Sequence, residues 1–518
     1  MKTRSFLLSV LAALMLAGCS EDAREDEIPG NVLVGKAYLS LSLQSRTSTL
    51  TRVDVKTENG SAEESAVNDV TVLLFDEDEV CLDVVDFTGV KVGNSDGGTS
   101  PIAEASDAQL VPEKTKKVFV VLNSAKWTFT KEAVVGKAWS TINTAIDAVI
   151  GDVATASKFM MASAGTKADG ALTPVTVHKP TTYTAEDVQK AKDAAKAAPA
   201  TINVDRLSAK VQVSQASSFT QPAGSNFTFN GWELSVTNKS VRLYSDLVTY
   251  DNATPGAVYR QDKNYLKSEQ PDGANMDAAF NYLKNIDKID DDMPAVAQSN
   301  KASLYCLENT MEATAQQLGF TTKVVVKAQY TPDGIAEKAN YFSWKGKYYT
   351  LDELKAEYLK HSDGSGLKVD LPAFLKKAGV MSQAEFEQGQ GKRDEIVAGL
   401  SDDGTSGNLN AKTGILGRFC AVRYYHASVC YYDVLIRHDQ NITTKMALGR
   451  YGVVRNNWYN IELNSVSGPG TPWIPDPSDP DPTNPTDPDT DDDEADAYLS
   501  VKITINPWTY WTQGVDLH

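Results

Sequence analysis

The alternation of apolar and polar residues predicts a β-strand near the start of the chain. Within residues 36–43, Leu39, Leu41 and Leu43 occupy alternate positions, and Tyr38, Ser40 and Ser42 alternate with them. Successive side chains of a strand point to opposite faces, so the three leucines share one face. The pattern therefore predicts a half-buried strand, followed by a polar stretch that contains Arg46 and Arg52.

Further runs rich in Val, Ile, Leu, Tyr and Phe, bounded by Gly, Asn, Asp and Pro, predict most of the other strands. They occupy residues 69–75, 117–123, 203–213, 232–238, 322–330, 417–425, 429–438 and 458–466. Many short strands with little helical alternation favour packed β-sheets over a parallel sheet. A loop rich in Gly, Ser and Asp, residues 93–107, separates the first two runs.

Helical patterns are few. Residues 137–150 place Trp139, Ile142, Ile146 and Val149 at spacings of three and four, which predicts an amphipathic helix.

A second helix is predicted over 184–198, where Thr184 and Asp187 resemble a capping box. Two mixed helical stretches, 275–289 and 351–400, interrupt the later strands as an insertion spanning 275–400.

The last fifty residues change in kind. Residues 468–497 are rich in Pro and Asp, so they predict an extended linker. Residues 498–518 then begin with a new strand pattern, in which the apolar face consists of Leu499, Val501, Ile503 and Ile505. An apolar strand on a tether presents unpaired backbone groups to water, so it needs a groove to occupy.

The two apolar end strands resemble each other. Residues 37–43 read AYLSLSL and residues 497–503 read AYLSVKI, which are identical at four of seven positions. One interpretation is that both strands fit the same kind of groove. The alternative is a chance repeat in two edge strands of one domain.

The first interpretation predicts assembly by β-strand addition. A protease cuts after Arg46 or Arg52, strand 37–43 leaves, and the tail strand of a neighbouring copy takes its place. Because every copy donates a tail and accepts one, the contacts run head to tail and build a filament. We prefer Arg46, which lies closest behind the displaced strand.

The N-terminus predicts export. A basic start and a short apolar stretch over residues 1–18 form a signal peptide that ends in Leu-Ala-Gly-Cys. This ending resembles the lipobox of bacterial lipoproteins, so Cys19 is expected to carry lipid; an ordinary signal peptide with a chance cysteine is the alternative. The acidic residues that follow resemble a surface-export signal of Bacteroidales lipoproteins or form a solvated tether.

Length and charge set the remaining bounds. The 518 residues suffice for two β-rich domains, expected at 53–203 and 204–467 behind a lipidated propeptide, 19–52. A net charge of −18 disfavours binding to nucleic acid.

Motifs of enzymes and metal sites are absent from the sequence, so we expect neither catalysis nor a cofactor. The aspartates at 487, 489, 491 and 493 lack the glycine and glutamate of a calcium loop. Cys420 and Cys430 could pair or remain buried thiols, as expected for Cys81 and Cys306. The five histidines have no ligand spacing. Trp344, Tyr348 and Tyr349 could stack on a sugar, although packing is the simpler role.

Residues 450–472 read RYGVVRNNWYNIELNSVSGPGTP and are followed by the Pro/Asp linker and a strand ending in Pro507-Trp508. This arrangement resembles the fimbrillins of Bacteroidales type V pili, especially the shaft subunits of minor fimbriae, and residues 450–472 are its most specific part. Weaker resemblances lie at 117–123, 159–163, 204–213 and the Tyr348-Tyr349 pair.

This resemblance implies two transthyretin-like β-sandwich domains, lipoprotein export, cleavage by an arginine-specific surface protease and polymerisation by donor-strand exchange. The implied partners are identical subunits, other fimbrial subunits and, before maturation, the outer membrane through Cys19. A competing hypothesis is a monomeric, anchor or tip lipoprotein of the cell surface that binds glycans or host proteins.

Overall fold

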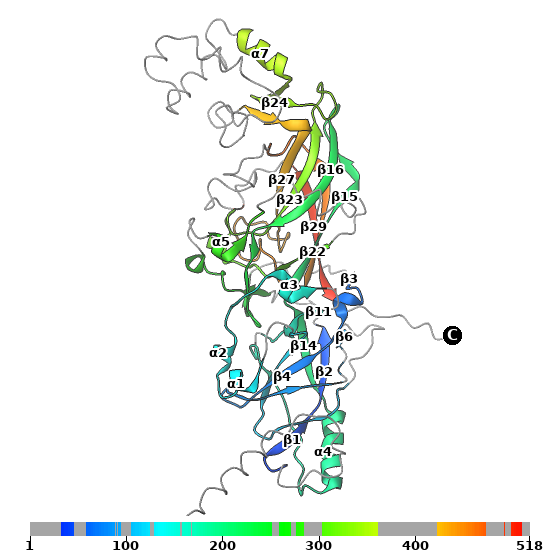
Figure 1. Cartoon of the computed structure of the whole chain (residues 1–518), viewed down its shortest axis with the longest axis vertical. Coiled ribbons are helices and arrows are strands. Elements are labelled where there is room, and N and C mark those ends of the chain that lie inside the picture. The colour runs from blue at the N-terminus through cyan, green and yellow to red at the C-terminus, as the bar shows by residue number, and fades with distance from the viewer. Residues whose placement is uncertain are drawn as a thin grey trace, which may run out of the picture.

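The protein is a mainly β structure with several sheets and few helices (Figure 1), seen in a computed structural model of the chain. The structure describes residues 33–45, 58–88, 90, 92–94, 105–124, 129–155, 158–166, 168–250, 258–270, 276–283, 303–360, 422–472, 492 and 499–509.

The first large sheet is built from the N-terminal part of the chain. Its strands lie in the order β5 (Cys81–Asp86), β4 (Val70–Phe75), β8 (Lys117–Leu122), β12 (Met161–Ser163), β14 (Ala200–Arg206), β2 (Leu41–Ser45) and β6 (Val92–Asn94), with β13 (Thr173–Pro174) beside β8. Both faces are covered, because the successive side chains Leu73 and Leu74 are each fully buried, in two different apolar clusters.

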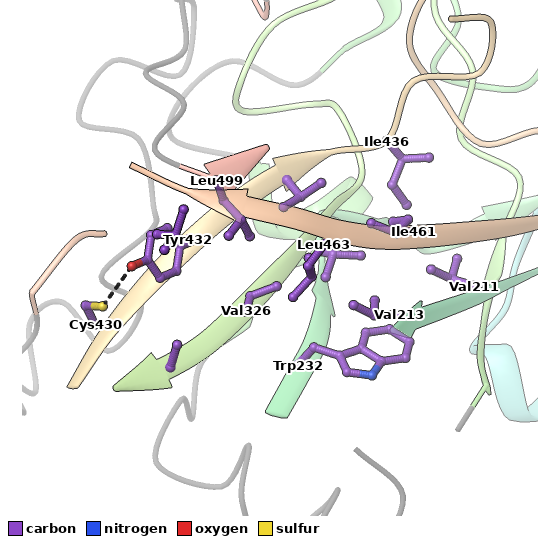
Figure 2. Close-up of a cluster of buried hydrophobic side chains, with 14 of the residues drawn as sticks. Val211, Val213, Trp232, Val326, Cys430, Tyr432, Ile436, Ile461, Leu463 and Leu499 are labelled. Atoms are coloured by element: carbon purple, nitrogen blue, oxygen red, sulfur yellow. Dashed lines mark hydrogen bonds between the residues drawn. The ribbon is translucent and has the colours of Figure 1, made fainter. Parts of the chain in front are cut away.

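Two further sheets form the C-terminal part. One has the order β22 (Ser303–Leu307), β15 (Ser208–Thr220), β28 (Asn457–Val466), β29 (Leu499–Thr509) and β3 (Glu58–Asn59); the other has the order β16 (Asn226–Ser235), β23 (Lys323–Thr331) and β27 (Val429–Leu435). Their side chains share one core, in which Trp232 and Val326 face Val213 and Leu463 (Figure 2). The two sheets are therefore held together by apolar burial.

Shorter strands complete the described sheets. They are β9 (Ile146–Asp147) with β18 (Ser240–Val241), β10 (Ala154–Thr155) with β11 (Lys158–Phe159), β17 (Thr237–Asn238) with β21 (Phe280–Asn281), β19 (Asp246–Thr249) with β20 (Val258–Gln261), and β25 (Lys347–Tyr349), β24 (Tyr341–Trp344) and β26 (Arg423–Tyr425) in one sheet.

The predicted helix at 184–198 is confirmed as α4 (Ala185–Ala197). The Thr184 side chain caps it by accepting a hydrogen bond from the Asp187 backbone N–H at 3.3 Å. Asp187 itself accepts a hydrogen bond from the Thr182 backbone at 2.9 Å, so the reciprocal partner lies two residues before the expected one.

The predicted helix at 137–150 is wrong. The segment forms one turn, α2 (Trp139–Ile142), then strand β9, and then a second turn, α3 (Ile150–Val153). Asn143 ends α2 by exchanging two hydrogen bonds with the Tyr244 backbone, at 2.9 and 3.0 Å. These tertiary contacts outweigh the local helical periodicity.

The insertion is helical only in part among the described residues. α5 (Met276–Ala279) is a single turn that passes directly into β21, which corrects the helix expected at 275–289. α7 (Leu351–Lys360) confirms the start of the second helical stretch, and residues 361–421 lie outside the described part.

Buried ion pairs join the N-terminal and C-terminal parts of the chain. Asp205 of β14 pairs with Arg260 of β20 at 2.6 Å, and its other oxygen accepts a hydrogen bond from Asn456 at 3.1 Å. Glu64, ahead of β4, pairs with Lys210 of β15 at 2.8 Å. Although burial by itself raises the pKa of Glu64, Lys210 and the Tyr305 hydroxyl hold it below its ordinary value.

Asp262 makes stability depend on pH. Burial raises the pKa of its carboxyl group to about 7, against the opposing effect of hydrogen bonds from the Thr310 and Asn264 backbones, with Glu308 adding to the rise and Arg242 opposing it. The folded protein then keeps a proton that the unfolded chain releases near pH 4. Stability is expected to fall as pH rises from about 4 to about 7, by at most about 1.4 kcal/mol per unit.

Urea unfolding at a series of pH values checks this expectation. Asp262→Asn should flatten the decline over that window, whatever its effect on absolute stability. An unchanged slope in the variant would assign the decline to other groups.

Candidate functional site

The strand predicted at 36–43 is the centre of the site, and it lies inside the N-terminal sheet. It forms two strands, β1 (Lys36–Leu39) and β2 (Leu41–Ser45). β2 runs parallel to β14 on one side and to β6 on the other. β1 pairs in antiparallel fashion with β7 (Gln109–Pro112). Removing this segment would therefore expose the edges of three strands.

The apolar face of the segment is completely buried. Leu39, Leu41 and Leu43 are at most 1% exposed. They pack in a cluster with Val70, Val72, Leu74, Phe87, Val111, Val118, Val120, Leu122, Phe159, Met161, Ile202 and Val204. At about 1.5–3 kcal/mol for each leucine, their burial contributes roughly 5–9 kcal/mol. The residues that surround the three leucines form the groove, and all of them follow Arg46 and Arg52 in the sequence.

One polar side chain holds the middle of the segment. The Ser40 hydroxyl donates a hydrogen bond to the Ser106 carbonyl oxygen at 2.7 Å, and the Ser106 hydroxyl accepts one from the Leu41 backbone at 2.9 Å. The Ser106 backbone N–H donates to the Leu41 carbonyl oxygen at 2.8 Å. Both serines are 1% exposed, so this contact is dry and specific to one register.

The beginning of the segment rests on helix α4 (Figure 1). Tyr38 packs against Ala191 and Ala195, and the ammonium group of Lys192 lies 5.7 Å from the centre of its ring. The Tyr38 backbone exchanges hydrogen bonds with the His178 backbone at 2.8 and 2.9 Å. The helix thus supplies a packing surface for the aromatic side chain of Tyr38.

The uncut chain is expected to depend on Leu41. Leu41→Ala in the full chain should lower the free energy of unfolding by about 2–5 kcal/mol, because it leaves a cavity in a fully buried cluster. Urea unfolding measures the loss, and Leu266→Ala, at a side chain that is 40% exposed, is the control. Equal effects of the two substitutions would mean that the segment contributes little to the fold.

The C-terminal strand occupies a place that the sequence did not predict. β29 pairs in antiparallel fashion with β28 of its own chain, from Asn457 opposite Pro507 to Val466 opposite Leu499. Leu499 is 7% exposed and reaches the C-terminal core beside Tyr432 (Figure 2). The expectation of a strand without a partner in its own chain is therefore wrong for this structure: β28 offers it an unfilled edge and an apolar core.

The end of β29 also contacts the beginning of the chain. Trp508 and Thr509 pair in parallel with Glu58 and Asn59 of β3, where the N-terminal and C-terminal parts meet (Figure 1). β3 follows Arg52 by only a few residues. The tail and the segment behind the predicted cuts therefore lie side by side.

Some predicted site residues cannot be placed. Cys19, Arg46, Arg52 and the linker, apart from Asp492, lie outside the described residues, as do the side chains of Ile503 and Ile505. Asp492 is 2% exposed and accepts a hydrogen bond from the Thr321 hydroxyl at 2.5 Å. The linker therefore touches the C-terminal part at this residue.

The cysteines and aromatic residues that were considered as chemical sites pack inside the fold where the structure describes them. Cys81, Cys306 and Cys430 are buried free thiols, and burial raises their pKa values to about 11, 12 and 11. Thiols with such pKa values are poor nucleophiles. Trp344 is buried, and Tyr348 meets the ring of Tyr341 edge-on at 5.9 Å, so both pack in the fold.

Metal and membrane sites were also sought among the described residues. They contain no group of three or more His, Cys, Asp or Glu side chains arranged to hold a metal ion. Within the same residues, no helix is both long and apolar enough to cross a membrane.

Sequence reasoning found the leucines of the segment but missed the residues that receive them. Ser106 lies at the end of the loop expected at 93–107, where only its polar composition was informative. The sequence predicts the helix at 184–198 but not that its Ala191 and Ala195 contact Tyr38. The repeated AYLS sequence was the available signal, since a repeated serine on the polar face suggests a repeated partner.

Two family models of fimbrial subunits match the chain. "Major fimbrial subunit protein (FimA)" matches residues 37–214, and "Major fimbrial subunit protein type IV, Fimbrillin, C-terminal" matches residues 423–514. Together they cover slightly more than half of the 518 residues. The chain belongs to the fimbrillin family. Fimbrillins are structural subunits of cell-surface fimbriae, so this chain has no enzymatic role.

The matched regions of this fimbrillin include both end strands. The first match begins at Ala37, within β1, and the second extends beyond β29. The insertion at 275–400 lies between the two matches.

Solved structures resemble the fimbrillin only distantly. A putative cell adhesion protein from Parabacteroides distasonis is 11% identical, with 92% of this chain and 99% of that chain covered and a TM-score of 0.41. The fimbrilin FimA of Porphyromonas gingivalis is 15% identical over 92% and 99% of the two chains, with a TM-score of 0.35. The tip fimbrial protein Mfa3 of the same species is 12% identical over 91% and 100%, with a TM-score of 0.34. No curated protein matches the chain.

Proposed function

We propose that this fimbrillin is a shaft subunit that polymerises by exchange of its terminal strands. In the precursor, β1 and β2 fill a groove of the N-terminal sheet. Proteolysis after Arg46 or Arg52 releases them, and residues 499–505 of a neighbouring copy enter the groove. The result is a head-to-tail filament on the cell surface that supports adhesion.

The observation that carries this proposal is the position of β2. A strand that lies between two parallel neighbours, yet precedes every other strand of its sheet in the chain, can be removed by a single cut without breaking another connection. Its loss exposes a row of backbone groups and an apolar floor. The tail of the same chain repeats residues 37–40, which directly precede β2, and its Val501, Ile503 and Ile505 continue the apolar alternation of β2. A tail strand that enters in the same direction therefore restores the parallel pairing.

Donation requires the tail to leave its own sheet first. β29 pairs with β28 and β3 in the single chain, so the energy of those contacts offsets part of the energy gained in the groove. A single copy therefore stores its tail, and assembly is favoured only when an empty groove is available. The cut behind Arg46 or Arg52 creates that groove.

The other parts of the chain fit the same route. Residues 1–18 direct export and Cys19 carries the lipid that holds the precursor at the outer membrane until maturation. Each half is a transthyretin-like β-sandwich: two sheets share one core in the C-terminal half, and apolar clusters cover both faces of the N-terminal sheet.

The test is N-terminal sequencing of the protein shed from the cell surface, beside an unboiled denaturing gel. A start at Thr47 or Val53 together with a ladder of heat-labile multimers is the expected result. A lipidated Cys19 on a single band would instead favour an anchor or a monomeric binding lipoprotein, and the shaft assignment would be withdrawn.

A further inference from the structure

The groove contains a contact that selects one register for the incoming strand. We propose that the strand of a second copy enters with Ser500 in the place of Ser40, and that Ser106 of the receiving copy fixes this register. The inference rests on the proposed strand exchange. It adds which side chain of the groove contacts which side chain of the donor strand.

Only some registers keep the apolar face of the donor toward the core. A shift by one residue turns every side chain to the opposite face, so odd shifts are excluded. The remaining choices are alignment of Leu499 with Leu39 and shifts from it by two residues. Apolarity alone does not distinguish them, because Val501, Ile503 and Ile505 continue the same face.

The polar position at Ser40 distinguishes them. Ser40 is 1% exposed and its hydroxyl lies 2.7 Å from the Ser106 carbonyl oxygen, so the site holds a small hydroxyl side chain. One shift would place Tyr498 there, and the opposite shift would place Lys502 there. A phenol ring exceeds the space, and an ammonium group would be buried without water. Thr504 also has a hydroxyl group, but placing it there would put Pro507, which has no backbone N–H, in the place of Leu43. Ser500 is therefore the residue that reproduces the side chain that the site already binds.

The alignment also gives Lys502 a tolerable position. It would replace Ser42, which is 7% exposed and lies opposite Thr201, an exposed residue of β14. Ser42 is itself buried, so a lysine there has to extend its stem past Thr201 to bring the ammonium group to water. In the same register Tyr498 takes the place of Tyr38 on helix α4, where Ala191 and Ala195 form its floor.

Ser500 has a different environment while the tail is paired with its own chain. In its own sheet, Ser500 is exposed, while its neighbour Leu499 is buried. The hydroxyl of Ser500 therefore occupies a surface position before exchange and gains a dry partner after it. Ser500, the counterpart of Ser40, thus changes from an exposed to a buried environment when the tail moves from its own sheet to the groove.

Cysteine cross-linking tests the register. In the uncut precursor, Ser40→Cys with Ser106→Cys should form an internal disulfide, because the two hydroxyl oxygens lie 3.4 Å apart. In the processed protein, Ser500→Cys with Ser106→Cys should join successive subunits, giving multimers that survive boiling until a reductant is added. Lys502→Cys with Ser106→Cys is the matched control and should yield multimers that boiling still separates.

The outcomes separate this inference from the proposed function. Cross-links through position 502 and not through 500 would overturn the register and leave strand exchange intact. Absence of multimers from the unsubstituted protein would overturn strand exchange itself.

A second measurement covers variants that assemble poorly. Ser106→Ala multimers should dissociate on heating about 5-fold faster or more than the unsubstituted multimers, since a buried backbone N–H loses its acceptor. Unchanged dissociation would contradict a role for Ser106.

Discussion

A chain carrying both Arg46→Lys and Arg52→Lys is expected to reach the cell surface uncut and to form no multimers. Lysine keeps the positive charge and the length of the side chain, so folding and export should be unaffected, whereas an arginine-specific protease no longer has its substrate. The groove then stays filled by β1 and β2, whose three buried leucines contribute roughly 5–9 kcal/mol to its occupation. N-terminal sequencing and an unboiled gel should show lipidated Cys19 and a single band.

The single substitutions identify the cut. If Arg46 is the site, Arg46→Lys alone should remove the start at Thr47, and Arg52→Lys should leave it. Arg423→Lys, at an exposed position in β26, is the matched control for loss of an arginine and should process normally. Multimers of normal length from the doubly substituted chain would show that assembly does not require release of β1 and β2.

The second large effect concerns the buried ion pair between Glu308 and Arg455. Their charged groups lie 2.9 Å apart and are at most 2% exposed. Arg455 also donates hydrogen bonds to the backbone carbonyl oxygens of Leu243 and Arg242, both at 2.9 Å. Burial by itself raises the pKa of Glu308, but Arg455, Arg260 and Ser245 hold it below its ordinary value, so the carboxylate stays charged at neutral pH.

Glu308→Ala is therefore expected to lower the free energy of unfolding by about 3–5 kcal/mol, because it leaves Arg455 charged and buried without its partner. Urea unfolding at pH 7 measures the loss. Glu186→Ala is the control: it breaks an exposed pair with Lys190, in which the Glu186 side chain is 78% exposed, and should have no measurable effect. A Glu308→Ala chain as stable as the unsubstituted protein would show that the residues around Arg455 rearrange to accommodate an unpaired arginine.

The strands were largely predictable because each carries its own signal. β4, β8, β23, β27 and β28 lie within a few residues of the runs expected for them. A strand buried on one or both faces needs apolar residues at fixed intervals, so the sequence records its future environment. The helix α4 was predictable for a similar reason, since Thr184 caps its first turn locally.

The segment 137–150 shows where such reasoning fails. Trp139 and Ile142 do face the core at helical spacing, but Ile146 pairs with Val241 in a short strand. A spacing of three or four residues is compatible with a helix and also with two separate turns that contact one core. The distant partner Tyr244 decides between them, and it lies about a hundred residues further along the chain.

The sequence by itself determined the two end strands, their shared AYLS pattern and the arginines between the first strand and the domain behind it, because these are properties of neighbouring residues. Only the tertiary structure decided that β2 lies between β14 and β6, that Ser106 binds Ser40, and that β29 is stored against β28. Those contacts join residues that are far apart in the chain. Which edge accepts a strand depends on the free energy of the whole sheet, and no local pattern encodes it.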